Sequence, residues 1–308
     1  MSPGLREDDW TYDPAESRRD LRLDFLRGLC LLKMVFNHLW HTPLHVVQQW
    51  LGYVTAAEAF FFISGAVVGI VHGRRARQQG LGVVSRQVLT RALQLYLANL
   101  AFVFLFASME ASGWLAKNWY LGLWSGGFHG LALFRFDQPY YLAVLPRYVA
   151  FLALTPLALW CLLRRRSLWL LAATFGVWGA NLLLGLRLKV PILEVGRDFP
   201  IASWQVLFFV GMVLGFHRQR LAQGWRRLSG GPWLVGLAAG AVGFVLLRRA
   251  QEAGMLSIPG HWVHFLVGRE QLGPLRLLNL AVTFTFLFEL THRYWSPLKT
   301  AAGRVLLP

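Results

Sequence analysis

The sequence predicts an all-α protein, a polytopic bundle of transmembrane helices with its amino terminus in the cytoplasm. Hydrophobic residues make up 56% of the 308 residues and charged residues make up 15%. Soluble domains average ~45–50% and ~25% for these two classes. The apolar residues also fall in blocks of about 20, the length that a helix needs to cross ~30 Å of hydrocarbon. A soluble fold of this length would need more polar surface than this composition supplies.

We predict eight membrane-spanning segments, of which the sixth is short and the seventh is rich in glycine. They cover residues 22–41, 50–72, 88–109, 140–163, 167–186, 201–216, 232–250 and 272–292. Tryptophan and tyrosine gather at the ends of these blocks, which is typical of the aromatic belts at a membrane boundary. The expected organisation is a polar cytoplasmic segment over residues 1–21 followed by one membrane domain over residues 22–308.

The distribution of lysine and arginine predicts the orientation. With the amino terminus inside, the inner flanks carry roughly twice as many basic residues as the outer flanks, as the positive-inside rule requires. The net charge of +16 is then explained by charges that set topology and face lipid, and nucleic acid is not an expected partner. Residues 1–21 carry six acidic residues and no apolar core, so we expect no removable signal peptide.

The first segment contains ionisable side chains, which cost ~2.5–3.5 kcal/mol at mid-helix and therefore indicate function. Asp24 and Arg27 are three residues apart and can pair on one helical face. Arg27 and His38 share a face, roughly 16 Å apart at 1.5 Å per residue. A neutral imidazole in the outer part of the bilayer can remove a proton from a hydroxyl. The alternative is that His38 and Asn37 join helices through hydrogen bonds, and the sequence leaves both open.

The second segment places Glu58 at a depth similar to that of His38. A carboxylate that faces an imidazole holds its tautomer and stabilises its cationic form. Ser64 and Gly65 form a small patch that lets helices approach closely, and we favour packing over a nucleophilic role for Ser64. Lys33 of the first segment points to another face, where it either snorkels or pairs with another helix.

Two predicted outer segments, residues 110–139 and 251–271, combine aromatic side chains with polar groups. The aromatic and histidine residues in question are Trp114, Trp119, Trp124, Phe128, His129, Phe134, Phe136, Tyr140, Tyr141, His261, Trp262 and His264. Planar rings beside polar groups suit stacking on sugars, but an interfacial belt is an equal alternative. Cys30 and Cys161 lie inside apolar blocks, which favours small buried hydrophobes over a disulfide or a metal pair.

Taken in order along the chain, these motifs resemble the OpgC family of osmoregulated periplasmic glucan succinyltransferases, within the acyltransferase 3 superfamily of membrane acyltransferases. Arg27 and His38 are separated by ten residues and resemble the first-helix Arg/His motif of the superfamily. Residues 58–65 resemble its acidic-x-Phe-Phe-x-x-Ser-Gly motif. The resemblance to the OpgC family rests on residues 22–28, 37–38, 56–60, 141–148, 203–211 and 273–276. It covers about residues 20–304.

The resemblance implies transfer of an acyl group, with succinyl expected, from cytoplasmic acyl-CoA to a hydroxyl of a periplasmic glucan. It implies that His38 is the general base, that Glu58 is the acidic partner and that Arg27 handles the donor. Arg86 and Arg91, at the start of the third segment, resemble inner arginines of the family, and guanidinium groups suit CoA phosphates.

The resemblance also implies where the protein works and with what. Asn37 or Glu58 would orient the His38 ring, acyl-CoA would be the donor substrate, and no metal or permanently bound cofactor is expected. The protein would be a multi-pass protein of the bacterial cytoplasmic membrane, with the lipid bilayer and a saccharide acceptor as partners.

Family members usually continue past a Gly-Arg-x-Ser-Leu-like stretch, whereas this sequence stops at Pro308. We therefore expect a truncated chain or a divergent short member, and a natural bundle of about ten spans. Two alternatives to an acyltransferase stay open. The first is a transporter or exporter of saccharide or acyl material, since a mid-membrane Arg and His fit that class as well. The second is an inactive, truncated scaffold.

Overall fold

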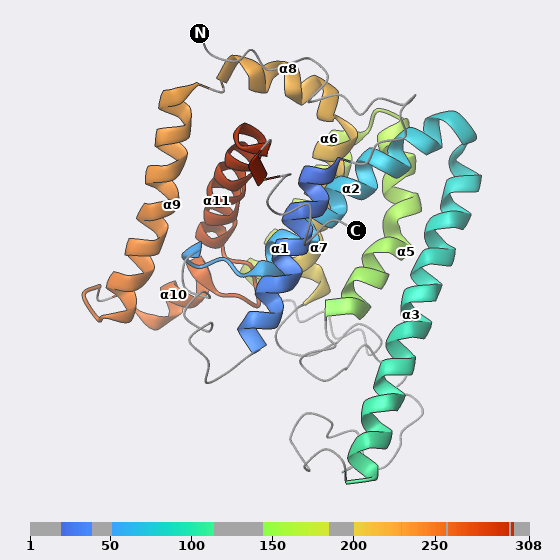
Figure 1. The fold of residues 1–308 in the computed structure, drawn as a ribbon, viewed down its shortest axis with the longest axis horizontal. Coiled ribbons are helices and arrows are strands. Elements are labelled where there is room, and N and C mark those ends of the chain that lie inside the picture. The colour runs from blue at the N-terminus through green and yellow to red at the C-terminus, as the bar shows by residue number, and fades with distance from the viewer. Residues whose placement is uncertain are drawn as a thin grey trace.

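The computed structural model of the protein describes residues 20–38, 51–113, 144–184, 200–228, 230–256, 258–295 and 297–298. Over these residues the chain forms helices and no strand, which confirms the predicted all-α fold. The helices are α1 (Leu21–His38), α2 (Ala56–Gln79), α3 (Leu81–Ala111), α5 (Val144–Leu163), α6 (Ser167–Leu184), α7 (Ile201–Phe216), α8 (Arg218–Leu228), α9 (Gly231–Glu252), α10 (Gly260–Val267) and α11 (Pro274–Arg293) (Figure 1).

Each of the eight predicted segments contains one long helix. Within the described ranges, six helices are long and apolar enough to span a membrane: α2, α3, α5, α6, α9 and α11. A seventh span is possible if α7 and α8, which are bent by 79° relative to each other, count as one. α1 is as long as α6 but carries several charged residues. The chain is therefore a membrane protein, and the count of eight spans and the side of the amino terminus stay predictions.

Three helix boundaries in α2 and α3 differ from the prediction. α2 begins at Ala56 instead of residue 50, because Thr55 caps it and Glu58 lies at the third helical position, which is the capping-box arrangement. α2 continues through residues 73–79 and α3 begins earlier, at Leu81, and the arginine and glutamine residues in these stretches have good helix propensity. In addition, the predicted outer segment 251–271 contains the short helix α10.

The backbones of α2 and α7 are in contact. Gly65 and Gly69 of α2 face α7, and Gly211 and Gly215 of α7 face α2. A Cβ atom at any of these four positions would collide with a backbone carbonyl oxygen of the opposite helix. The four-residue spacing on each helix is the small-xxx-small pattern, which lets membrane helices approach closely. The sequence prediction that Gly65 serves helix approach is therefore confirmed.

An aromatic cluster fills the space beside this contact. Phe61 of α2 lies edge-to-face against Phe151 of α5, with ring centroids 5.4 Å apart, and against Trp204 of α7 at 5.6 Å. Phe151 also contacts Phe208 of α7 at 5.6 Å. All four side chains are fully buried, and edge-to-face pairs add stability beyond the area that they bury. The core of the protein therefore lies between α2, α5 and α7.

The outer helices present apolar side chains away from this core. Leu168 and Trp169 of α6, Val235 and Leu246 of α9 and Leu97 of α3 are among the large hydrophobic residues that are exposed. A surface of this kind is unfavourable in water but suits contact with lipid chains. Cys30 on α1 and Cys161 on α5 are free thiols of intermediate exposure.

We predict that Gly211→Leu destabilises the bundle strongly. The added side chain has to displace the α2 backbone, and overpacking of this kind costs ~1–3 kcal/mol or more. The matched control is Gly176→Leu in α6, where an added Cβ meets nothing within 4 Å. Thermal unfolding in detergent should show a lower midpoint for Gly211→Leu alone. Equal shifts for the two variants would contradict the close contact.

Candidate active site

A buried ion pair joins the amino-terminal ends of α2 and α11. The Nε atom of Arg276 donates to Oε1 of Glu58 at 2.6 Å, and Nη2 of Arg276 lies 2.5 Å from the same oxygen. The other carboxylate oxygen accepts the backbone N–H of Thr55 at 2.9 Å and the Thr55 hydroxyl. Glu58 is fully buried and Arg276 is 6% exposed. Each charge therefore compensates the other where water does not reach.

The segment that leads into α2 is held by polar contacts from α9 and α11. Asn279, one turn after Arg276, accepts the backbone N–H of Tyr53 at 2.8 Å, and its amide donates to Thr283 at 2.8 Å. Arg248 of α9 donates to the carbonyl of Gly52 at 2.6 Å. Gly52 has φ +65°, and a Cβ there would lie 2.7 Å from the Asn279 side-chain oxygen, so only glycine fits this turn.

α1 contributes a lysine to this region. Lys33 is partly buried, and α1 packs along α2. Which of the two possibilities that the sequence left open holds for Lys33, snorkelling or pairing with another helix, stays a prediction. We call Lys33, Glu58, Arg248 and Arg276 the α2 entry cluster. Because Glu252 pairs with Arg248 at 2.8 Å, the three cations of the cluster are offset by two carboxylates.

His38, the predicted general base, is the last residue of α1. Its side chain lies outside the described residues, so its pairing with Glu58 stays a prediction. Asn37, its neighbour, is partly buried in the last turn of α1. The four donors to Glu58 described above already occupy the roughly four lone-pair sites of an ionised carboxylate, so a bond from His38 would have to replace one of them.

The predicted donor-handling arginines fall into two groups. Arg27 pairs with Asp24 at 3.4 Å, which confirms the pairing expected from their spacing. Arg86 and Arg91 are both exposed on α3, and their role in donor binding stays a prediction.

Arg276 is the site residue whose role the sequence did not reveal, although it stood in a motif of the family resemblance. It was counted with the outer basic flanks, whereas the structure buries it against Glu58. The indication was present in Glu58 itself. A carboxylate inside an apolar segment needs a cation, and no lysine or arginine follows it in α2 until Arg74.

Comparison with known protein families matches residues 19–308 to the family described as OpgC protein. Comparisons with curated proteins and with solved structures give no match. The family match covers nearly the whole chain, including every helix described above.

We predict that Arg276→Gln is much more destabilising than the double variant Glu58→Gln/Arg276→Gln. Removing one partner of a buried pair leaves an uncompensated charge, at a cost of ~3–5 kcal/mol, whereas removing both charges avoids most of this cost. Thermal unfolding in detergent measures both. The control is Arg249→Gln, since Arg249 pairs with Glu252 at an exposed position and such pairs contribute ~0–1 kcal/mol. A double variant no more stable than Arg276→Gln would contradict the pairing.

Proposed function

The chain belongs to the OpgC family, and from this premise we propose that it is a membrane O-acyltransferase. The donor would be acyl-CoA in the cytoplasm, the acceptor a hydroxyl of a periplasmic glucan, and succinyl the acyl group that the family resemblance favours. We place the protein in the bacterial cytoplasmic membrane, where the bilayer separates donor from acceptor. Acyl-CoA acts as a substrate, and no permanently bound cofactor is required.

The observation that carries this proposal is the series of ionisable groups along α1. Asp24 and Arg27 lie near its start, Lys33 lies towards its middle, and Asn37 and His38 end the helix. Each charge at mid-membrane costs ~2.5–3.5 kcal/mol, so such residues are retained where they serve a function or a partner. A helix that carries polar groups from one end to the other supports passage of a polar or thioester group through the bundle.

In the proposed reaction His38 acts as the general base. The neutral imidazole takes the proton of the acceptor hydroxyl, and the oxygen attacks the thioester carbonyl carbon to form a tetrahedral intermediate. When this intermediate collapses, the C–S bond breaks and the imidazolium returns its proton to the CoA thiolate. The products are an ester and free CoA, and His38 is neutral again.

Two neighbours would orient the His38 ring. Glu58 is fixed by Arg276 and Thr55, so its carboxylate is rigid, and an imidazole N–H would replace one of its present donors. Asn37, next to His38 in the chain, is the alternative.

We predict that His38→Ala abolishes transfer. General-base catalysis contributes ~10²–10⁴-fold, so label from radioactive succinyl-CoA should reach an added glucan at a rate at least ~100-fold lower. The control is His72→Ala, which removes a histidine from the carboxy-terminal half of α2, away from Glu58. Mass spectrometry of periplasmic glucans from cells with and without the protein identifies the product.

Two outcomes would overturn the proposal. The first is a well-expressed His38→Ala protein that acylates glucan at the wild-type rate. The second is movement of saccharide or acyl material across the membrane with no covalent change, which is the behaviour of a transporter.

A further inference from the structure

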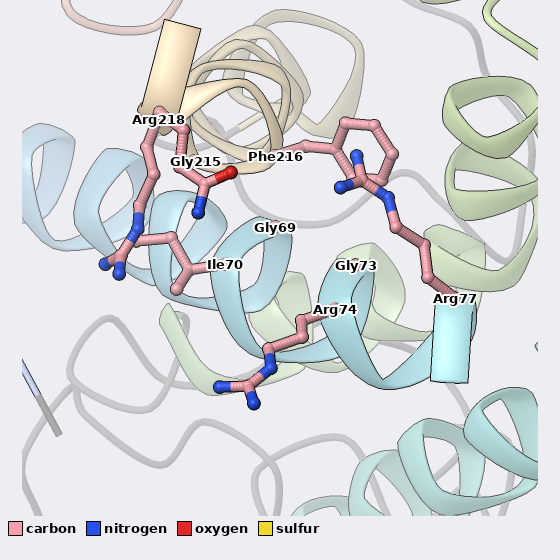
Figure 2. A pocket seen from close by; sticks show the side chains of 9 residues that line it. Gly69, Ile70, Gly73, Arg74, Arg77, Gly215, Phe216 and Arg218 are labelled. Atoms are coloured by element: carbon pink, nitrogen blue, oxygen red, sulfur yellow. The ribbon is translucent and has the colours of Figure 1, made fainter. Parts of the chain in front are cut away.

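A pocket lies where α2 and the junction of α7 and α8 diverge (Figure 2). Its volume is about 140 Å³. Three arginines line it: Arg74 and Arg77 of α2, and Arg218 at the start of α8. In Figure 1, α8 lies at the opposite end of the bundle from α10, so the pocket is remote from the α2 entry cluster. With the predicted orientation, it opens on the cytoplasmic side.

The pocket exists because of the same glycines that bring α2 and α7 together. Gly69 and Gly73 of α2 and Gly215 of α7 line it. The chain turns by 79° between α7 and α8, so α7 leaves α2 just beyond Gly215. All three glycines are buried, because the facing helix or the ring of Phe216 occupies the space beside each of them, so they form the wall of the pocket.

The electrostatics of the pocket favour an anion. Among the described residues, those that line it are all neutral or basic. The guanidinium of Arg77 stacks on the ring of Phe216, 4.2 Å from the centroid, which holds it at the wall of the pocket. Arg218 also pairs with Asp20, at 3.9 Å.

We propose that this pocket binds phosphate groups of the acyl-CoA donor. The identification of the ligand rests on the proposed function, whereas the preference for a phosphate follows from the pocket itself. Guanidinium groups bind phosphate through paired N–H donors, and three of them line this pocket from two segments of the chain. Phosphate anchoring is thereby assigned to Arg74, Arg77 and Arg218 in place of Arg86 and Arg91, which do not line the pocket.

The position of the pocket suits this role. Arg74 lies sixteen residues after Glu58 on the same helix, which is roughly 24 Å at 1.5 Å per residue. A donor anchored at the pocket by its phosphates would need an extended arm to bring its acyl group towards the α2 entry cluster. A thioester carried at the end of a long pantetheine arm has this form.

The test is a binding measurement with coenzyme A itself, which needs neither an acceptor nor turnover. The whole chain is placed in phosphatidylcholine nanodiscs, and calorimetry gives the affinity. We expect Arg74→Gln, Arg77→Gln and Arg218→Gln each to weaken binding by about tenfold, since a hydrogen bond to a charged group is worth about that factor. The matched control is Arg75→Gln, an exposed arginine on the same turn that does not line the pocket, which should leave the affinity unchanged.

Several results would overturn the assignment. One is that the wild-type protein does not bind coenzyme A. Another is that Arg75→Gln lowers the affinity for coenzyme A as much as the pocket variants do. A third is that only Arg86→Gln and Arg91→Gln lower this affinity. A fourth result concerns lipid, whose headgroups also carry phosphate. If the three pocket variants bind coenzyme A normally but retain less phosphatidylglycerol in mixed nanodiscs, the pocket is a lipid headgroup site.

Failure of this inference is distinguishable from failure of the proposed function. A protein that transfers labelled succinyl groups, with coenzyme A affinity unaffected by the pocket variants, is an acyltransferase whose donor phosphates bind elsewhere. A protein that binds coenzyme A through the three arginines but transfers nothing has the pocket without the proposed activity.

Discussion

The backbones of α2 and α7 touch because glycines stand where side chains would otherwise separate the two helices. In lipid, apolar side chains gain little from leaving the surrounding acyl chains, so close packing and polar contacts have to hold a bundle together. The glycine contact supplies the packing, and the cluster of Phe61, Phe151, Trp204 and Phe208 is built against it. The same contact fixes what lies at the two ends of α2.

At the amino-terminal end of α2, the burial of Glu58 constrains the neighbouring elements. A buried carboxylate is tolerated only with a cation and hydrogen-bond donors, and these come from Arg276 of α11 and from Thr55. α11 therefore has to start beside α2, and Asn279 then holds the segment that enters α2. α1, with its terminal His38, packs along α2. One buried side chain thus joins α2 and α11.

At the other end of α2, the chain bends between α7 and α8, and the arginine pocket lies beside this bend. Gly69 and Gly73 of α2 line it. One helix therefore carries an acidic side chain at one end and two pocket arginines at the other, at a spacing close to the ~30 Å thickness of the hydrocarbon core. This separation is what a reaction needs when its donor and acceptor lie on opposite sides of a membrane, and the proposed acyltransferase would use both ends of α2.

The sequence by itself determined what depends on local spacing. Segment length and hydropathy predicted the all-α fold and the helices within it, and the three-residue spacing of Asp24 and Arg27 predicted their pairing. Only the tertiary structure decided which helices are neighbours. Arg276 lies 218 residues from Glu58, and Arg218 and Arg74 line one pocket only because the chain bends by 79° between α7 and α8 beside α2. The periodicity of a helix fixes which face a residue occupies, but the partner of that face depends on the packing of the whole bundle.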